Sequence, residues 1–434
     1  MSISSSLNAG VAGLNSNGTR LATISDNISN ASTYGYKRAV AEFQNMVIGE
    51  GTGVGFSAGG VRATTGRLVD VRSSLISTSN PTDISISGRG MLPVTELSGL
   101  ANNPDQNDLL LVSTGSFRPD SDGYLRTPSG HVLMGWPADA DGTVPEFPRD
   151  TVDGLEPIVV ALNQIAANPT TRIGVGVNLP STATSAGATG ESQVLSIEYF
   201  DNMGSSERLG VTFVPTVPTS GSSNSWTMTI TDSASDDATI GSYVLVFDES
   251  RSAGGTLLSV TSDAGDSYDS ETGLLDLNVA GGPMSLDIGK LGDPAGITQL
   301  GDSFLPTSIT RDGSPGGSLS SVEIDPVGNL IGTYDGGFTR TLYKVPVVDV
   351  RNPNGLIPME NQAFSISRDS GPFFLWDAGQ GPTGAMAGFS REGSATDVAT
   401  ELTSLIQTQR AYSSNAKVIQ TVDEMLQETT NLKR

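Results

Sequence analysis

The sequence contains 434 residues, no cysteine and a formal net charge of −23, which excludes disulfide frameworks and thiolate metal sites. Between residues 173 and 289, fifteen acidic side chains accompany two basic ones, and this local charge of −13 argues against nucleic-acid binding. The length predicts two or three folded units, and 52 glycines and 23 prolines with 16% charged residues favour β-rich units joined by tight turns.

Residues 1–30 are predicted to form a helix, because apolar residues recur on one face with heptad spacing. The residues of this seam are Leu7, Val11, Leu14, Leu21, Ile24 and Ile28. The opposite face carries asparagine, serine, glycine and threonine, so the isolated helix should be weak and should require a partner. The segment lacks the basic and continuous apolar regions of a cleaved secretory signal, and no apolar run in the chain is long enough to span a bilayer.

The next segment, residues 31–72, is predicted to be an extended linker, to which residues 387–394 form the returning strand of chain. It is rich in glycine, and its flexibility is expected at Gly49, Gly51, Gly53 and Gly55.

The middle of the chain predicts two β-rich domains. Residues 73–169 alternate apolar and polar side chains between Asp-Gly turns, and residues 295–386 repeat this style, so together they predict a discontinuous inner β-domain. Residues 170–294 contain further strand-like stretches with long polar loops and predict an outer acidic β-domain. We therefore expect the outer domain to be inserted into the inner one.

Residues 395–434 predict a second long helix with an alternating four-three seam, interrupted at Gln409 and Asp423. The seam consists of Val398, Leu402, Leu405, Tyr412, Ala416, Ile419 and Leu426. Each terminal helix alone is equally consistent with an ordinary amphipathic helix packed on a neighbouring domain. Together they predict an α+β, mainly β protein whose terminal helices pair as a coiled coil, with two nested β-rich outer domains.

No credible active site, cofactor site or metal site is predicted. His131 is the one histidine and is expected to be an exposed turn residue. Ser57 lies in a Gly-x-Ser-x-Gly pattern, but glycine-rich linker surrounds it instead of the strand and helix that a nucleophile needs. The acidic residues Asp263, Asp266, Asp269 and Glu271 lack the spacing of an EF-hand and are expected to form a solvated loop.

Two motifs resemble the signatures of the bacterial flagellar rod, hook and hook-associated axial proteins. The segment from Ile24 to Lys37 resembles the N-terminal signature, and the segment from Gln409 to Leu426 resembles the C-terminal one. The matching residues are Asn27, Asn30, Ala31, Thr33, Gly35 and Lys37 near the start, and Gln409, Arg410, Ala411, Tyr412, Asn415, Ala416 and Lys417 near the end.

The resemblance implies a structural subunit of the flagellar hook, which self-assembles into a flexible curved tube and acts as a universal joint between motor and filament. It implies no enzyme activity and no cofactor. The implied partners are other copies of the chain, a hook cap protein, a distal rod protein, a hook-filament junction protein and the type III export apparatus, at an extracellular location in the flagellum, without nucleic acid or membrane insertion. The alternatives are a distal rod or junction subunit of the same family, a secreted β-rich adhesin, and a hydrolase that uses Ser57 or carboxylate pairs.

Overall fold

The computed structural model describes residues 3–46, 58–96, 109–139, 141–161, 165–265 and 267–431. Contacts divide the chain into two compact units. Unit 1 comprises residues 1–161, 321–332 and 340–434, and unit 2 comprises residues 162–320 and 333–339. The fold is mainly β with helices at the two ends, which confirms the predicted fold class.

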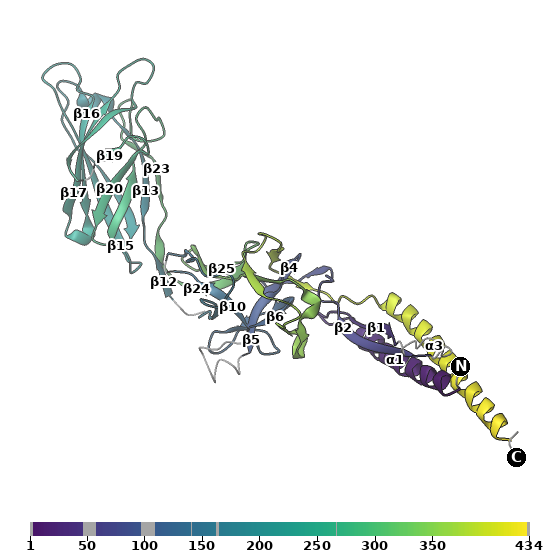
Figure 1. Ribbon diagram of the computed structural model, residues 1–434. Coiled ribbons are helices and arrows are strands. Elements are labelled where there is room, and N and C mark those ends of the chain that lie inside the picture. Colours follow the sequence, from purple (N-terminus) through teal and green to yellow (C-terminus); the bar gives the residue numbers. More distant parts are fainter. Residues whose placement is uncertain are drawn as a thin grey trace. The chain divides into compact units, whose positions relative to one another are not determined.

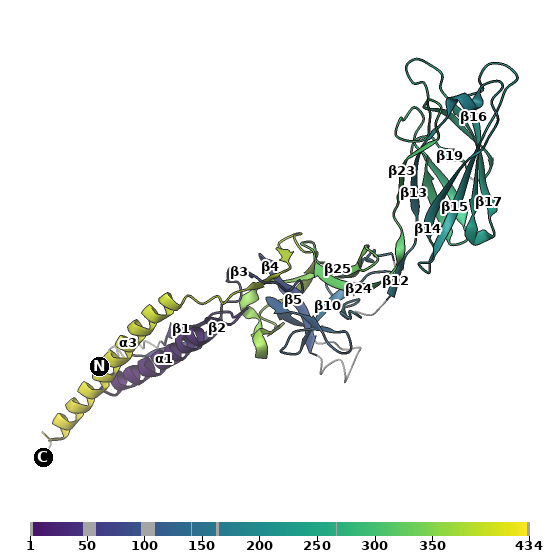
Figure 2. The same ribbon diagram turned by 180° about the vertical axis from the view of Figure 1, so that it is seen from behind.

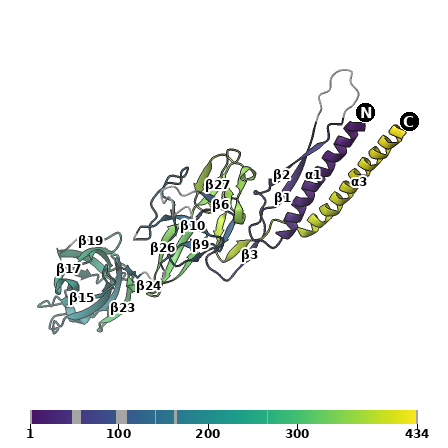
Figure 3. The same ribbon diagram turned by 90° about the horizontal axis from the view of Figure 1, so that it is seen from below.

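The two terminal helices of unit 1 are α1 (Ile3–Ser29) and α3 (Val398–Asn431), and they lie side by side (Figure 1 and Figure 3). They run antiparallel, because the start of α1 lies near the end of α3 and the end of α1 near its start. Gly10 lies against Ile419, and Asn27 donates a hydrogen bond to Glu401. Helix α3 begins after Asp397, whose carboxylate accepts the backbone N–H of Thr400 at 3.0 Å and so satisfies a free donor of the first turn. Within the described residues, no helix is long and apolar enough to cross a membrane.

The expected extended linker contains regular structure. Strands β1 (Ala39–Asn45) and β2 (Val61–Arg67) pair antiparallel in register from Ala39 opposite Arg67 to Asn45 opposite Val61. This ribbon lies along α1 (Figure 3), where Ser16 donates its hydroxyl to the carbonyl of Val61 at 3.2 Å. The described part of the linker is extended, as expected, and it is paired as a two-stranded ribbon because the helix supplies a surface on which the ribbon packs.

The β-part of unit 1 is built around one sheet. Its strand order is β25-β26-β10-β5-β6-β29-β28, and small sheets β3-β32, β31-β4-β7 and β27-β30 flank it. The strands not yet given are β3 (Leu75–Ser77), β4 (Asp83–Ser87), β5 (Leu92–Glu96), β6 (Leu110–Val112), β7 (Thr114–Ser116), β8 (Arg118–Pro119), β9 (Leu125–Arg126), β10 (His131–Pro137), β11 (Glu156–Pro157), β25 (Asn329–Tyr334), β26 (Thr339–Lys344), β27 (Val347–Val350), β28 (Ile357–Pro358), β29 (Phe364–Ser365), β30 (Phe373–Trp376), β31 (Ala385–Ala387) and β32 (Ser390–Glu392). Its core includes Leu111, Trp136 and Phe364.

Unit 2 consists of two sheets that enclose one core. A five-stranded antiparallel meander, β14 to β18, contributes alternate side chains such as Trp226, Met228 and Ile230 (Figure 2). The second sheet has the order β19-β20-β21-β13-β22, with β23 also paired to β13. The bounds are β12 (Ile165–Asn168), β13 (Arg172–Leu179), β14 (Gln193–Phe200), β15 (Ser206–Pro215), β16 (Ser225–Asp232), β17 (Ala238–Phe247), β18 (Leu257–Ala264), β19 (Tyr268–Asp269), β20 (Leu274–Val279), β21 (Gly282–Asp287), β22 (Thr298–Gln299), β23 (Leu305–Arg311) and β24 (Ser314–Ile324).

The boundaries of unit 2 differ from the predicted outer domain, residues 170–294. Residues 305–311 pair with β13 along its length, and Ile165 lies opposite Ser318 across β12 and β24. Residues 295–320 therefore belong to unit 2 and not to the inner β-domain. The sequence pattern of alternating strands is the same on both sides of residue 294, so it could not locate this boundary.

Candidate functional site: the terminal helices

The contact between α1 and α3 includes two glycines of α1. A Cβ atom added to Gly13 would lie 2.8 Å from Nδ2 of Asn415, and one added to Gly10 would lie 3.1 Å from Cγ1 of Ile419. The two helix backbones therefore approach closely where α1 has glycine. The Gly10 contact uses Ile419 of the predicted seam, whereas the Gly13 contact uses a polar residue outside it.

The heptad line of α3 that is most buried consists of Glu401, Thr408 and Val422, with Asn415 half-buried between them. These positions are seven residues apart and lie beside the predicted seam positions 402, 409 and 416. Positions 402, 409 and 416 are exposed, so this part of the predicted seam is not the line that is buried against α1. Glutamate and threonine were not considered for a buried seam because such residues are usually exposed.

The predicted apolar seam is only partly buried within the subunit. Ile24 is buried, and Leu7, Leu14, Leu21, Ile28, Leu405 and Ile419 are half-buried. The exposed members are Val11, Val398, Leu402, Tyr412, Ala416 and Leu426. Leu402 and Tyr412 keep 46% and 45% of their surface exposed, so a single subunit leaves large apolar side chains of α3 in water.

Asn27 of the N-terminal signature joins three elements. Its side-chain amide donates to the carbonyl of Ala39 at 2.8 Å and to Oε1 of Glu401 at 3.1 Å, and its Oδ1 accepts the Ala39 N–H at 2.8 Å. Tyr36 donates its hydroxyl to Oδ1 of Asn27 at 3.0 Å, and Arg38 forms an ion pair with Glu401. Asn27 thereby fixes the start of β1 and the first turns of α3 to the end of α1.

Lys37 forms a second buried polar cluster. Its ammonium donates to Oε1 of Glu392 at 2.7 Å and to the carbonyl of Val71 at 3.0 Å, and Glu392 also accepts the N–H of Ser73 at 3.0 Å. Lys37 and Glu392 are 1% and 2% exposed. Burial lowers the pKa of Lys37 below its ordinary value, although the carboxylate of Glu392 opposes the shift.

The rest of the N-terminal signature shapes the chain after α1. Asn30 donates to the carbonyl of Asp26 at 2.9 Å and accepts the hydroxyl of Thr33 at 3.2 Å. Gly35 has a φ of +70°, and a Cβ there would lie 3.0 Å from Thr114, so the position requires glycine. Ala31 is half-buried beside them.

The C-terminal signature lies on α3 and is mostly exposed. Asn415 faces Gly13 of α1. The exposed signature residues are Gln409, Arg410, Ala411, Tyr412, Ala416 and Lys417. The two signatures thus differ in kind, because the first is a buried polar network within the subunit and the second is chiefly a surface.

Three charged residues of these networks were missed by sequence reasoning: Arg38, Glu392 and Glu401. Glu401 carried a usable signal, since it stands seven residues before Thr408 and fourteen before Asn415 on one helical line. Glu392 and Arg38 carried none, because their partners are distant in sequence.

The other predicted sites fare as follows. Gly49, Gly51, Gly53, Gly55, Ser57 and Asp266 lie outside the described residues. His131 is 4% exposed within β10, so the expectation of an exposed turn residue was wrong. It is buried because it begins a strand whose other residues are mostly apolar and buried in the sheet. This burial lowers the pKa of His131. In the described part of the chain, no group of three or more histidine or acidic residues could hold a metal ion.

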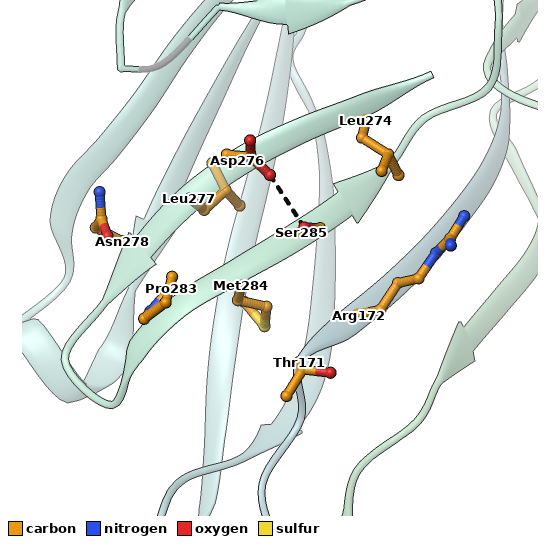
Figure 4. Close-up of a pocket in the computed structure, with 9 residues that line it drawn as sticks. All are labelled: Thr171, Arg172, Leu274, Asp276, Leu277, Asn278, Pro283, Met284 and Ser285. Atoms are coloured by element: carbon orange, nitrogen blue, oxygen red, sulfur yellow. Dashed lines mark hydrogen bonds between the residues drawn. The ribbon is translucent and has the colours of Figure 1, made fainter. Parts of the chain in front are cut away.

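Figure 4 shows a hollow on the second sheet of unit 2. Asp276 of β20 accepts the hydroxyl of Ser285 of β21 at 3.0 Å (dashed line in Figure 4). Arg172 of β13 also lines the hollow and pairs with Asp287 at 2.6 Å. The other lining residues are Thr171, Leu274, Leu277, Asn278, Pro283 and Met284. The lining contains no histidine, and its one carboxylate, Asp276, accepts the hydroxyl of Ser285.

Three family descriptions match separate parts of the chain. Residues 7–37 match "Flagella basal body rod protein", residues 167–314 match "Flagellar basal body protein FlaE D2 domain", and residues 386–432 match "Flagellar basal body rod FlgEFG protein C-terminal". The first and last matches cover the two helices, and the second falls within unit 2.

Several relatives align over the full length. The flagellar hook protein FlgE of Rhizobium meliloti (strain 1021) is 30% identical over 444 residues and covers 100% of both chains. That of Brucella suis biovar 1 (strain 1330) is 30% identical over 442 residues with the same coverage, and that of Escherichia coli (strain K12) is 27% identical over 98% of both chains. The crystal structure of Helicobacter pylori flagellar hook protein FlgE2 aligns with 72% of this chain and 98% of that chain, at a TM-score of 0.45 and 13% identity.

Proposed function

The chain belongs to the flagellar hook protein family, and from that premise we propose that it polymerises through its terminal helices into the tube of the hook. It is a structural subunit of the bacterial flagellar hook. The observation that carries the proposed mode of assembly is that some residues of α3 contact α1 while other, apolar residues of α3 stay exposed. Asn415 and Ile419 of α3 lie against glycines of α1, while Val398, Leu402 and Tyr412 stay exposed.

Neighbouring copies would bury this exposed line. Fully burying one large apolar side chain contributes about 1.5–3 kcal/mol, and covering the exposed 42%, 46% and 45% of Val398, Leu402 and Tyr412 would contribute a corresponding part of that value to assembly. The terminal segments oppose this little by charge: residues 1–72 hold six basic and four acidic side chains, and residues 395–434 hold four and five. The ends of many copies can therefore lie together.

The β-rich parts would then form the outside of the tube. We assign the inner β-domain to the β-part of unit 1 and the outer domain to unit 2, whose acidic surface suits solvent. In the assembled hook, their polar surfaces would slide past one another as the curved tube rotates, which is how the hook would act as a universal joint between motor and filament.

The further partners follow from the family resemblance and are proposals. They are the hook cap protein during growth, the distal rod protein below, a hook-filament junction protein above and the type III export apparatus, with the assembled subunit outside the cell. A catalytic role is not proposed, and neither is a cofactor.

The test is self-assembly of the purified chain, followed by electron microscopy and sedimentation. The full chain should form short tubes, and deletion of residues 400–434 should abolish them while the β-rich units remain folded and soluble. Leu402→Ser should raise the critical concentration about tenfold or more. The matched control is Val418→Ser, which removes an equally exposed side chain of α3 off this line and should assemble normally. Unchanged assembly of both the deletion and Leu402→Ser would refute the proposal.

A further inference from the structure

A narrow ribbon in unit 1 leaves apolar side chains exposed on both of its faces. Strand β3 pairs with β32 in register from Leu75 opposite Glu392 to Ser77 opposite Ser390, and among the described strands β3 pairs with β32 alone. Leu75 and Ile76 are 37% and 42% exposed. The strand therefore presents an unpaired backbone edge together with apolar side chains (β3 is labelled in Figure 2).

Phe389 adjoins this ribbon in a strained conformation. Its φ is +52°, a region that bulky side chains rarely adopt, and 43% of its surface is exposed. Its carbonyl accepts the N–H of Thr78 at 2.7 Å, which fixes it to the end of β3. Glycine would meet the same backbone without strain. Neither backbone preference nor burial within the subunit accounts for an aromatic residue here.

One nitrogen of a cation on the same ribbon has no hydrogen-bond acceptor among the described residues. The guanidinium of Arg391 stacks 4.0 Å from the ring of Tyr34, and its Nε is buried without a partner among the described residues. Arg391 also attracts the carboxylate of Asp83 electrostatically, but that carboxylate already accepts hydrogen bonds from Asn80 and Ser116. Because this Nε is buried and the side chain as a whole is half-buried, an acceptor from outside the subunit would bind the terminal nitrogens of Arg391.

We propose that this ribbon patch, formed by Leu75, Ile76, Phe389 and Arg391, is a docking surface for a second copy of the chain, which supplies an apolar contact to Phe389 and a carboxylate to Arg391. The proposal rests on the proposed function, in which every subunit meets other copies. Charge supports this occupant, since the chain has 47 acidic residues against 24 basic ones. Position supports it as well, because five residues, 393–397, connect the ribbon to the exposed line of α3.

The absence of cysteine makes a direct test possible. In Ile76→Cys the only thiol of the chain lies on the ribbon patch, and its reaction with a maleimide is measured in the monomer and in assembled tubes. We expect labelling to be at least tenfold slower in the tubes. The control Phe374→Cys places a thiol at a site that is 47% exposed elsewhere in unit 1 and should react equally in both states. Equal labelling of Ile76→Cys in both states would overturn the docking surface.

A second variant separates contact from folding. Phe389→Gly removes the aromatic side chain and relieves the backbone, so the melting temperature of the monomer should be unchanged or higher while the critical concentration for assembly rises at least tenfold. A lower melting temperature, or unchanged assembly, would show that Phe389 serves the subunit itself and would overturn the proposal. If the unaltered chain forms no tubes, the proposed function fails; if it forms tubes in which Ile76→Cys stays reactive, only the ribbon interface fails.

Discussion

Replacing Glu392 by alanine would leave the ammonium of Lys37 buried without its carboxylate. Breaking a buried ion pair by removing one partner typically costs about 3–5 kcal/mol. Loss of the lysine's proton limits the part of this cost that comes from Lys37. At pH 7 deprotonation costs about 4.6 kcal/mol, from a reference pKa about 3.4 units higher at about 1.36 kcal/mol per unit. Since Lys37 is 1% exposed and donates to Glu392 at 2.7 Å, we expect Glu392→Ala to lower the free energy of unfolding of unit 1 by about 3–5 kcal/mol.

The penalty should depend on pH in a defined direction. In the variant, the folded state favours neutral Lys37, whereas the unfolded state keeps its proton up to a pKa of about 10.4. The unfolded state then binds more protons, so the stability of the variant rises with pH. The difference in the free energy of unfolding between the unaltered chain and the variant should shrink by up to about 1.4 kcal/mol for each pH unit between 7 and 9.

The assay is guanidinium unfolding followed by tryptophan fluorescence. Trp136 and Trp376 belong to unit 1 and Trp226 belongs to unit 2, so a Trp226→Phe background reports unit 1 alone. The control is Arg126→Ala, since Arg126 of unit 1 pairs with Asp120 at 3.3 Å and its side chain is 43% exposed, where such a loss costs about 1 kcal/mol or less. A loss below about 1 kcal/mol for Glu392→Ala, or a deficit that does not change with pH, would refute the reasoning.

Three further changes test other parts of unit 1. Gly13→Val should force α1 and α3 apart, because its Cβ would lie 2.8 Å from Asn415. Circular dichroism should then show that helix is lost at a lower temperature on heating. The control is Gly18→Val, because a Cβ at Gly18 meets open space. Asp397→Ala should destabilise α3 by about 1 kcal/mol through loss of its N-cap, measured as a lower helix signal, with Asp397→Asn nearly neutral. Burial raises the pKa of Tyr36 to about 12, so its stabilisation is complete below pH 10 and is lost toward pH 12; Tyr36→Phe should lose less stability over that window in alkaline unfolding.

The terminal helices were predictable because their apolar residues keep one period over many turns. Their facing surfaces were less so. Heptad spacing identifies candidate seams, but it does not say which of them the subunit itself covers, and the close contact at Gly10 and Gly13 depends on residues without side chains. The exposed Leu402 was chosen for its apolar character, whereas the buried Glu401 beside it is held by Arg38 and Asn27, which are more than 350 residues away.

The buried polar clusters illustrate the same limit. Lys37 was identified by its place in a signature, yet its partner Glu392 comes from the returning chain, 355 residues later. His131 was misassigned because a lone histidine near a turn is usually exposed, and only the pairing of β10 with β5 shows that the sheet encloses it. Local patterns predicted the strands, and the long-range pairings determined which polar residues they buried.

The pairing of Ile165 with Ser318 places the two segments by which the chain enters and leaves unit 2 next to each other, as antiparallel neighbours. Neighbouring strands lie about 4.8 Å apart, so the longer segment of unit 2, residues 162–320, begins and ends at nearly the same place. A folded module of another size, with its own ends equally close, could be exchanged at that place without altering the spacing of the terminal helices. Residues 162–320 are thereby free to diverge in length and surface while the segments of unit 1 stay constant.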